Sequence, residues 1–91
     1  MSDETFEQFS ARALAAGFQD VLVREWAPGQ QTAEHAHPFD VDAIVVRGEM
    51  WLTCGDSTRH IGPDQRFDLD RDVRHAERYG PEGATIWVAR R

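Results

Sequence analysis

Residues 29–48 read GQQTAEHAHPFDVDAIVVRG, and this stretch carries most of the information about the fold. It opens with a turn at Gly29, passes through a polar segment that holds His35 and His37, and ends in an apolar run. Side chains two residues apart on a β-strand point to the same face, so both imidazoles are expected to project together. Two adjacent imidazoles form half of a metal site. A His-x-His pair also occurs on exposed strands, so the rest of the chain has to be considered.

The rest of the chain alternates between short strand-like runs and turn residues. It predicts about eight strands, at 21–26, 31–37, 43–46, 50–54, 58–61, 66–69, 75–79 and 84–89. Turn signals separate them, at 27–29, 47–49, 55–56, 62–64 and 80–83. Many short strands with closely spaced turns favour an all-β barrel or sandwich over a parallel sheet.

The segment before the strands is predicted to be one helix, from about residue 5 to about residue 16. Thr5 and Gln8 are spaced as in a capping box, and Gly17 follows at a natural C-terminal stop. Apolar side chains recur at helical spacing: Phe6, Phe9, Ala13 and Leu14. The chain is therefore expected to form a single domain over 1–91, with an N-terminal helical segment (1–17) and a β-barrel (18–91).

Composition excludes several classes of function. The net charge is −6, so nucleic acid is not an expected partner, because phosphates need clustered positive charge. All ten basic residues are arginine, which excludes Schiff-base chemistry on a lysine. The single cysteine, Cys54, cannot form an internal disulfide and fits a reducing, cytoplasmic location. No apolar run has the length of a membrane span, so a membrane is not an expected partner either.

The first part of the chain resembles the first sequence motif of the cupin superfamily. That motif reads glycine, five residues, His-x-His, three or four residues, glutamate, six residues and glycine. The present chain matches its glycines and histidines with Gly29, His35, His37 and Gly48. His75 stands at the place of the histidine in the second motif.

Three short pieces are also similar to those of small single-domain bacterial cupins: 37–40 (HPFD), 47–49 (RGE) and 75–78 (HAER). The resemblance extends from about residue 18 to the end and implies a double-stranded β-helix, or jelly-roll, barrel behind the short helix. It also implies that His35, His37 and His75 are metal ligands, that the cofactor is one divalent ion (Fe, Ni, Mn or Zn), and that the protein is a homodimer.

The usual glutamate ligand of the first motif is missing, because Val41 falls at its position. Strand alternation directs Val41, Ala43 and Val45 inward. Asp42 is directed outward and would leave the spacing to the closing glycine one residue short. Asp40, at the bend before the strand, remains the candidate for a fourth ligand.

Two further side chains are candidates for catalysis. Glu77 and Tyr79 share the strand parity of His75, so all three are expected to face the barrel interior. Glu77 suits a general base or a further ligand, and Tyr79 a phenolic acid or base. The alternatives are a salt bridge between Glu77 and an arginine, and simple packing of the Tyr79 ring. His60 is predicted to be structural or on the surface.

These features support a metal-binding protein that binds or transforms a small organic molecule, with dioxygenase-like chemistry among the reactions implied by the resemblance. Three histidines leave coordination positions open for water, substrate or dioxygen. The alternative is a non-catalytic small-molecule binding or sensing module that has lost full metal ligation. A third hypothesis is a structural dimer with a filled barrel. The expected partners are a small-molecule ligand and a second copy of the chain.

Overall fold

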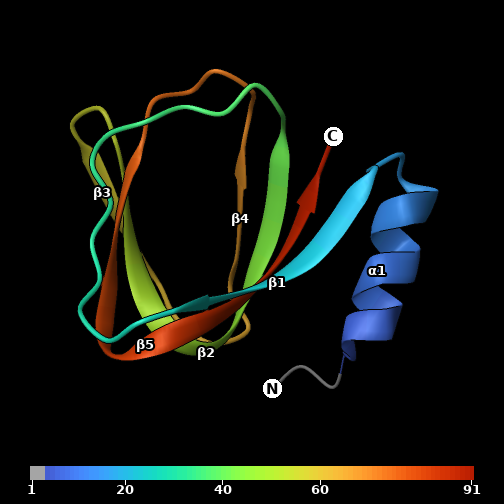
Figure 1. Ribbon diagram of the computed structural model, residues 1–91, viewed down its shortest axis with the longest axis horizontal. Helices are drawn as coiled ribbons and strands as arrows, with labels where there is room; N and C mark the ends of the chain where they lie inside the picture. The colour runs from blue at the N-terminus through green and yellow to red at the C-terminus, as the bar shows by residue number, and fades with distance from the viewer. Residues whose placement is uncertain (1–3) are drawn as a thin grey trace.

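One helix and five antiparallel strands make up the computed structural model, which describes residues 4–91 (Figure 1). Their bounds are α1 Phe6–Ala15, β1 Asp20–Trp26, β2 Val41–Cys54, β3 Ser57–Ile61, β4 Arg66–Leu69 and β5 Ala76–Arg90. The prediction of an all-β barrel with a short leading helix is confirmed. Residues 1–3 of the expected N-terminal segment lie outside the described range.

The two long strands, β2 and β5, form the spine of the sheet. They pair with each other from Val41 opposite Arg90 to Thr53 opposite Ala76. The edge strand β1 pairs with the second half of β5, whereas β4 and β3 pair with the first and second halves of β2. The sheet bends along these strands, so that its inward faces enclose one core (Figure 1).

The expected breaks at 47–49 and 80–83 are wrong, because β2 and β5 each run through the segment without interruption. The ladder between them shifts register instead, between Val45 and Arg47 and between Gly48 and Met50. A glycine in a strand can mark such a bulge, which bends the strand without ending it. These two mergers, together with the loss of the strand predicted at 31–37, reduce the eight predicted strands to five.

The strand predicted at 31–37 is also wrong, because this polar segment is a connection between β1 and β2. It runs beside β5 with isolated bridges from Gln31 to Arg78 and from His35 to His75. The segment has one β-branched residue, Thr32, and no Phe, Tyr or Trp, so it has few of the side chains that stabilise a continuous ladder. It still holds its histidines in place, because the His35–His75 bridge is made of two backbone hydrogen bonds, 2.9 and 2.8 Å long.

The helix packs on the outer face of the sheet and not inside the barrel (Figure 1). Its capping box is present as predicted: the Thr5 side chain accepts from the Gln8 N–H, and the Gln8 side chain accepts from the Thr5 N–H. Phe9 is buried, and its ring centroid lies 5.9 Å from that of Trp87 on β5. No helix of the described chain has the length and apolar character needed to cross a membrane.

The barrel interior holds the main core, whose members alternate along the strands as expected. Val41, Ala43 and Val45 are buried and face inward, which confirms the parity predicted for them. The other members come from all the strands except β1: Met50, Leu52, Ile61, Phe67, Leu69, Tyr79, Ala84 and Ile86. This core fills one part of the barrel and leaves a pocket in the other.

Candidate functional site

Three histidines from two separate segments meet at one end of the barrel pocket. His35 and His37 come from the connection between β1 and β2, and His75 stands immediately before β5. One ring nitrogen of each lies within 4.8 Å of those of the other two. The ring centroids of His35 and His75 are 4.3 Å apart, and those of His37 and His75 are 5.1 Å apart.

Backbone carbonyls fix the tautomers of two of these imidazoles. Nδ1 of His35 lies 2.8 Å from the carbonyl oxygen of Ala33, and Nδ1 of His75 lies 3.0 Å from that of Val73. A carbonyl can only accept, so each Nδ1 carries the hydrogen and each Nε2 keeps its lone pair. This is the arrangement by which proteins orient a metal-ligating histidine.

The most informative feature of the site is the environment of the Nε2 atom of His75. The side chain is 1% exposed, and this nitrogen has no hydrogen-bond partner among residues 4–91. Leaving a buried polar atom unpaired costs about 1–3 kcal/mol. The nearest charged atom is Oε1 of Glu77, at 3.5 Å, outside hydrogen-bond geometry. An unpaired acceptor among three converging imidazoles fits a bound cation, so the residues present suit a metal ion.

The surroundings of His37 favour its neutral imidazole form. Burial lowers the pKa of His37 below its ordinary value of 6.5, and the nearby imidazoles of His35 and His75 lower it further. The carboxylate of Glu77 opposes this effect, and the guanidinium of Arg24 adds to it. His37 is therefore neutral at neutral pH, as metal binding requires.

This lowered pKa predicts a pH-dependent stability for the metal-free protein. The unfolded chain takes up a proton on His37 at a higher pH than the folded chain does. The contribution of His37 to the free energy of unfolding is therefore complete above about pH 6.5 and is lost as the pH falls. We expect a lower melting temperature at about pH 5.5 than at about pH 7.5. In His37→Gln, the part of the change in melting temperature that arises from protonation of His37 should disappear. The same pH dependence in variant and wild type would contradict the assignment.

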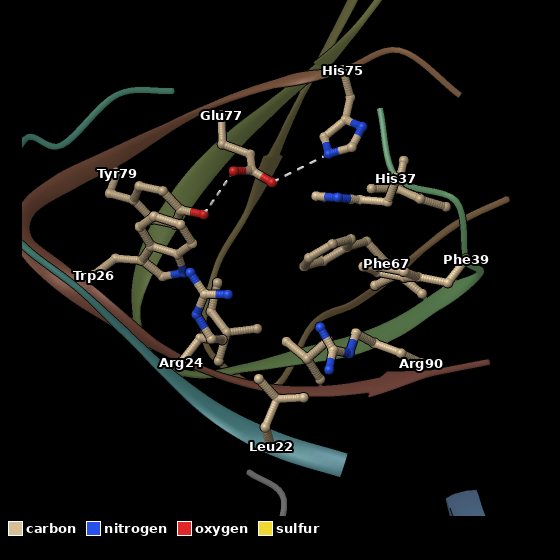
Figure 2. A pocket seen from close by; sticks show the side chains of 14 residues that line it. Leu22, Arg24, Trp26, His37, Phe39, Phe67, His75, Glu77, Tyr79 and Arg90 are labelled. Atoms are coloured by element: carbon tan, nitrogen blue, oxygen red, sulfur yellow. Dashed lines mark hydrogen bonds and ion pairs between the residues drawn. The ribbon is translucent and has the colours of Figure 1, made fainter. Parts of the chain in front are cut away.

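A chain of polar contacts leads from the histidines along β5 into the pocket (Figure 2). The hydroxyl of Tyr79 donates to Oε2 of Glu77 at 3.2 Å, and the other carboxylate oxygen faces His75. The hydroxyl of Thr32 lies 3.4 Å from Oε2. Burial and the Glu77 charge raise the pKa of Tyr79, so its phenol stays protonated and acts as a donor. The expected inward parity of His75, Glu77 and Tyr79 is confirmed.

The pocket itself has a volume of about 230 Å³. Two of the three histidines, His37 and His75, line it together with Glu77, and apolar side chains surround most of the remaining space (Figure 2). Its lining consists of Leu22, Arg24, Trp26, His37, Phe39, Val41, Phe67, Leu69, His75, Glu77, Tyr79, Ile86, Val88 and Arg90. The barrel is therefore not filled by its own side chains, in contrast to the hypothesis of a structural dimer.

Asp40, the expected fourth ligand, lies outside the three-histidine group. Its carboxylate accepts the backbone N–H of Arg71 at 2.8 Å and lies 3.7 Å from the guanidinium of Arg91. The hydrogen bonds from Arg71 lower the pKa of Asp40. Val41, at the position of the usual glutamate, forms part of the apolar wall. His60 also lies outside the group, with half of its side chain exposed, as predicted.

Sequence reasoning missed two arginines and one threonine that contribute to this pocket. Arg24 and Arg90 line it, and Thr32 supports Glu77. Alternation along β1 could have found Arg24, because it stands between Leu22 and Trp26, which share its face. The Trp26 ring stacks on Tyr79 at 4.6 Å and an angle of 9°, so this tryptophan lines the pocket.

Comparisons with known proteins identify the fold but no sequence relative. No protein-family model matches the chain, and no curated protein matches it. Among solved structures, a cupin-2 domain protein from Shewanella frigidimarina matches with 16% identity and a TM-score of 0.65, over 76% of this chain and 66% of that chain. An uncharacterised double-stranded β-helix protein from Klebsiella pneumoniae matches with 25% identity and a TM-score of 0.67, over 77% and 64%.

A third structure, of the DMSP lyases RdDddP and RnDddQII, matches with 22% identity and a TM-score of 0.71. The match covers 78% of this chain but 37% of that chain. The present chain thus spans less than two thirds of the length of each of these three neighbours. Likeness at this level of identity concerns the fold, and the chemistry has to be argued from the site.

Proposed function

Because the chain has a cupin fold, we propose that it is a metal-binding protein in which His35, His37 and His75 hold one divalent ion. The barrel pocket beside them binds a small organic molecule. The observation that supports this most is the buried Nε2 of His75, which has no hydrogen-bond partner and faces two further imidazoles. Asp40 is not part of the proposed ligand set, because its carboxylate is engaged by Arg71 and Arg91.

The donors restrict the ion to a class and do not select one metal. Three imidazole ligands are proposed to hold Fe, Ni, Mn or Zn, and as uncharged donors they would leave the positive charge of the ion uncompensated. Once bound, such an ion supplies a Lewis acid that polarises an oxygen of the substrate. The histidines contribute lone pairs and fixed orientation, since Nδ1 of His35 and of His75 is already held by a backbone carbonyl.

We propose Glu77 as the group that accepts a proton from the bound molecule, with Tyr79 as its partner. The carboxylate lines the pocket and keeps one oxygen directed toward His75. The Tyr79 hydroxyl donates to the other oxygen and so fixes the orientation of the carboxylate. A general base beside a Lewis acid suits proton abstraction, as lyases and isomerases require. The DMSP lyase neighbour is a precedent for lyase chemistry on this fold.

Elemental analysis of protein purified without a histidine tag tests this proposal. We expect close to one equivalent of iron, nickel, manganese or zinc per chain, and uptake of one equivalent by protein stripped of metal. A protein that is isolated without metal and fails to bind added Fe(II), Ni(II) or Zn(II) contradicts it. That result would favour the alternative, a binding or sensing module in which the histidines line the pocket without a metal.

A further inference from the structure

The pocket is positively charged although the chain as a whole is negative. Its lining contains one carboxylate, that of Glu77, and two guanidinium groups, those of Arg24 and Arg90. The net charge of the whole chain is −6, so the excess of positive charge in the pocket is opposite in sign to the charge of the chain. Both arginines lie across the pocket from His37 and His75 (Figure 2). A divalent ion on the histidines would add further positive charge, and an anion is the ligand that such a pocket attracts.

Arg24 is exposed on the edge strand β1, and it also lines the pocket. On β1 it stands between Leu22 and Trp26, and all three side chains face the pocket. Its guanidinium lies 4.7 Å from the ring centroid of Trp26, a stacking contact that fixes its direction. Among residues 4–91, the side chain of Arg24 makes no hydrogen bond and no ion pair, although its backbone pairs with β5. Its donors are thus available to a ligand.

Arg90 supplies a second observation that is independent of the first. Its Nε–H is buried without a hydrogen-bond partner in the described part of the chain, which is costly in a folded protein. One terminal nitrogen lies 3.5 Å from Asp20, and the guanidinium lies 4.9 Å from the Phe39 ring centroid. The ion pair with Asp20 therefore leaves part of its donor set unused.

We propose that the ligand of this pocket is a small carboxylic acid with an apolar body, whose carboxylate is bound by Arg24 with help from Arg90. The proposal rests on the proposed function in that the acid occupies the same pocket and directs its other end to the histidines. The guanidinium fork matches a carboxylate in geometry. The volume of about 230 Å³ is below the range of pockets for drug-sized ligands, about 300–1,000 Å³, so the acid has few carbon atoms.

Butyrate and its uncharged amide, butyramide, are matched probes for this inference. They have nearly the same size and shape, so a difference in affinity reports the charge. We would titrate each into metal-free and zinc-loaded protein and follow the indole N–H of Trp26 and the amides of β1 by NMR. Butyrate is expected to bind at least about tenfold more tightly than butyramide to the metal-free protein, because hydrogen bonds to charged groups are the stronger ones.

Arg24→Gln and Arg78→Gln provide the matched variants. Arg78 also stacks on a tryptophan, with its guanidinium 4.1 Å from the Trp51 ring centroid, but it does not line this pocket. Arg24→Gln is expected to remove the tenfold preference for butyrate, and Arg24→Lys to restore part of it. Arg78→Gln should keep the full preference. Arg90→Gln should lower it to a smaller extent, because Asp20 already engages that guanidinium.

The inference is overturned if wild-type protein binds both probes equally or neither of them, or if Arg24→Gln keeps the preference. Metal content measured on the same samples distinguishes a failure of the carboxylate site from a failure of the proposed metal site. Arg24→Gln should retain the metal of the wild type, since Arg24 is not among the histidine ligands. A protein that binds no metal but still prefers butyrate through Arg24 would refute the metal site and leave the carboxylate site standing.

Discussion

Replacing His37 by alanine is expected to lower the affinity for the bound metal at least about tenfold. Changes in residues that merely orient a ligand already cost about 10–100-fold, and His37→Ala removes a ligand itself. The remaining pair, His35 and His75, would hold the ion through two nitrogens. His37 is the best position for this test, because its side chain is half-buried whereas that of His75 is fully buried. A change at His37 therefore leaves the core intact.

His60→Ala is the matched control for this experiment. His60 is a histidine on the same barrel, with half of its side chain exposed, and its nearest groups are Trp51 and Glu49. It should keep the metal content of the wild type. Competition with a coloured zinc chelator gives the affinity of both variants on one scale. Equal affinity in His37→Ala and wild type, or metal loss in His60→Ala, would show that the ion binds elsewhere.

Much of this site could be predicted from the sequence because its members follow local rules. His35 and His37 are two residues apart, and His75, Glu77 and Tyr79 alternate along one segment. Such spacings place side chains on one face whether or not the segment forms a regular strand. The 31–37 segment is a connection and not a strand, yet its histidines converge as expected.

The contribution of β1 could not be predicted in the same way. Which strand pairs with β5, and hence which side chains stand opposite the histidines, depends on contacts between residues that are far apart in the sequence, such as Arg24 and Ile86. Nothing near Arg24 in the sequence indicates that its partners across the pocket are His37 and His75. The contacts of Asp40 could not be predicted for a similar reason, since its partners Arg71 and Arg91 are distant in the chain.

The glycines in the segments 47–49 and 80–83 mark irregular points of the chain, but they do not end strands. Turn residues at 47–49 and 80–83 predicted the ends of strands, whereas they lie inside β2 and β5. The physical reason is that Gly48 and Gly83 both have positive φ, 78° and 71°, and lie against each other where the two strands are bulged. A glycine that permits close approach of two strands has the same sequence signal as a glycine in a turn.

Gly48→Ala is therefore expected to be among the most damaging single changes in the chain. A Cβ atom at this position would lie 2.0 Å from the carbonyl oxygen of Gly83 and 2.9 Å from Cα of Ala84. Both obstacles are backbone atoms of β5, which cannot move aside without opening the barrel. The positive φ adds about 1–2 kcal/mol for any residue with a Cβ. We expect a total loss of about 4 kcal/mol or more in the free energy of unfolding.

Gly55→Ala separates the two parts of this cost. Gly55 has a similar φ of 61°, in the turn between β2 and β3, but a Cβ there would meet no atom within 4 Å. It should lose about 1–2 kcal/mol, the cost of backbone conformation alone. Urea unfolding of the metal-free proteins measures both values. Equal losses at the two positions would show that β2 and β5 can separate at Gly48, and that the motif glycine serves backbone conformation and not the contact between the strands.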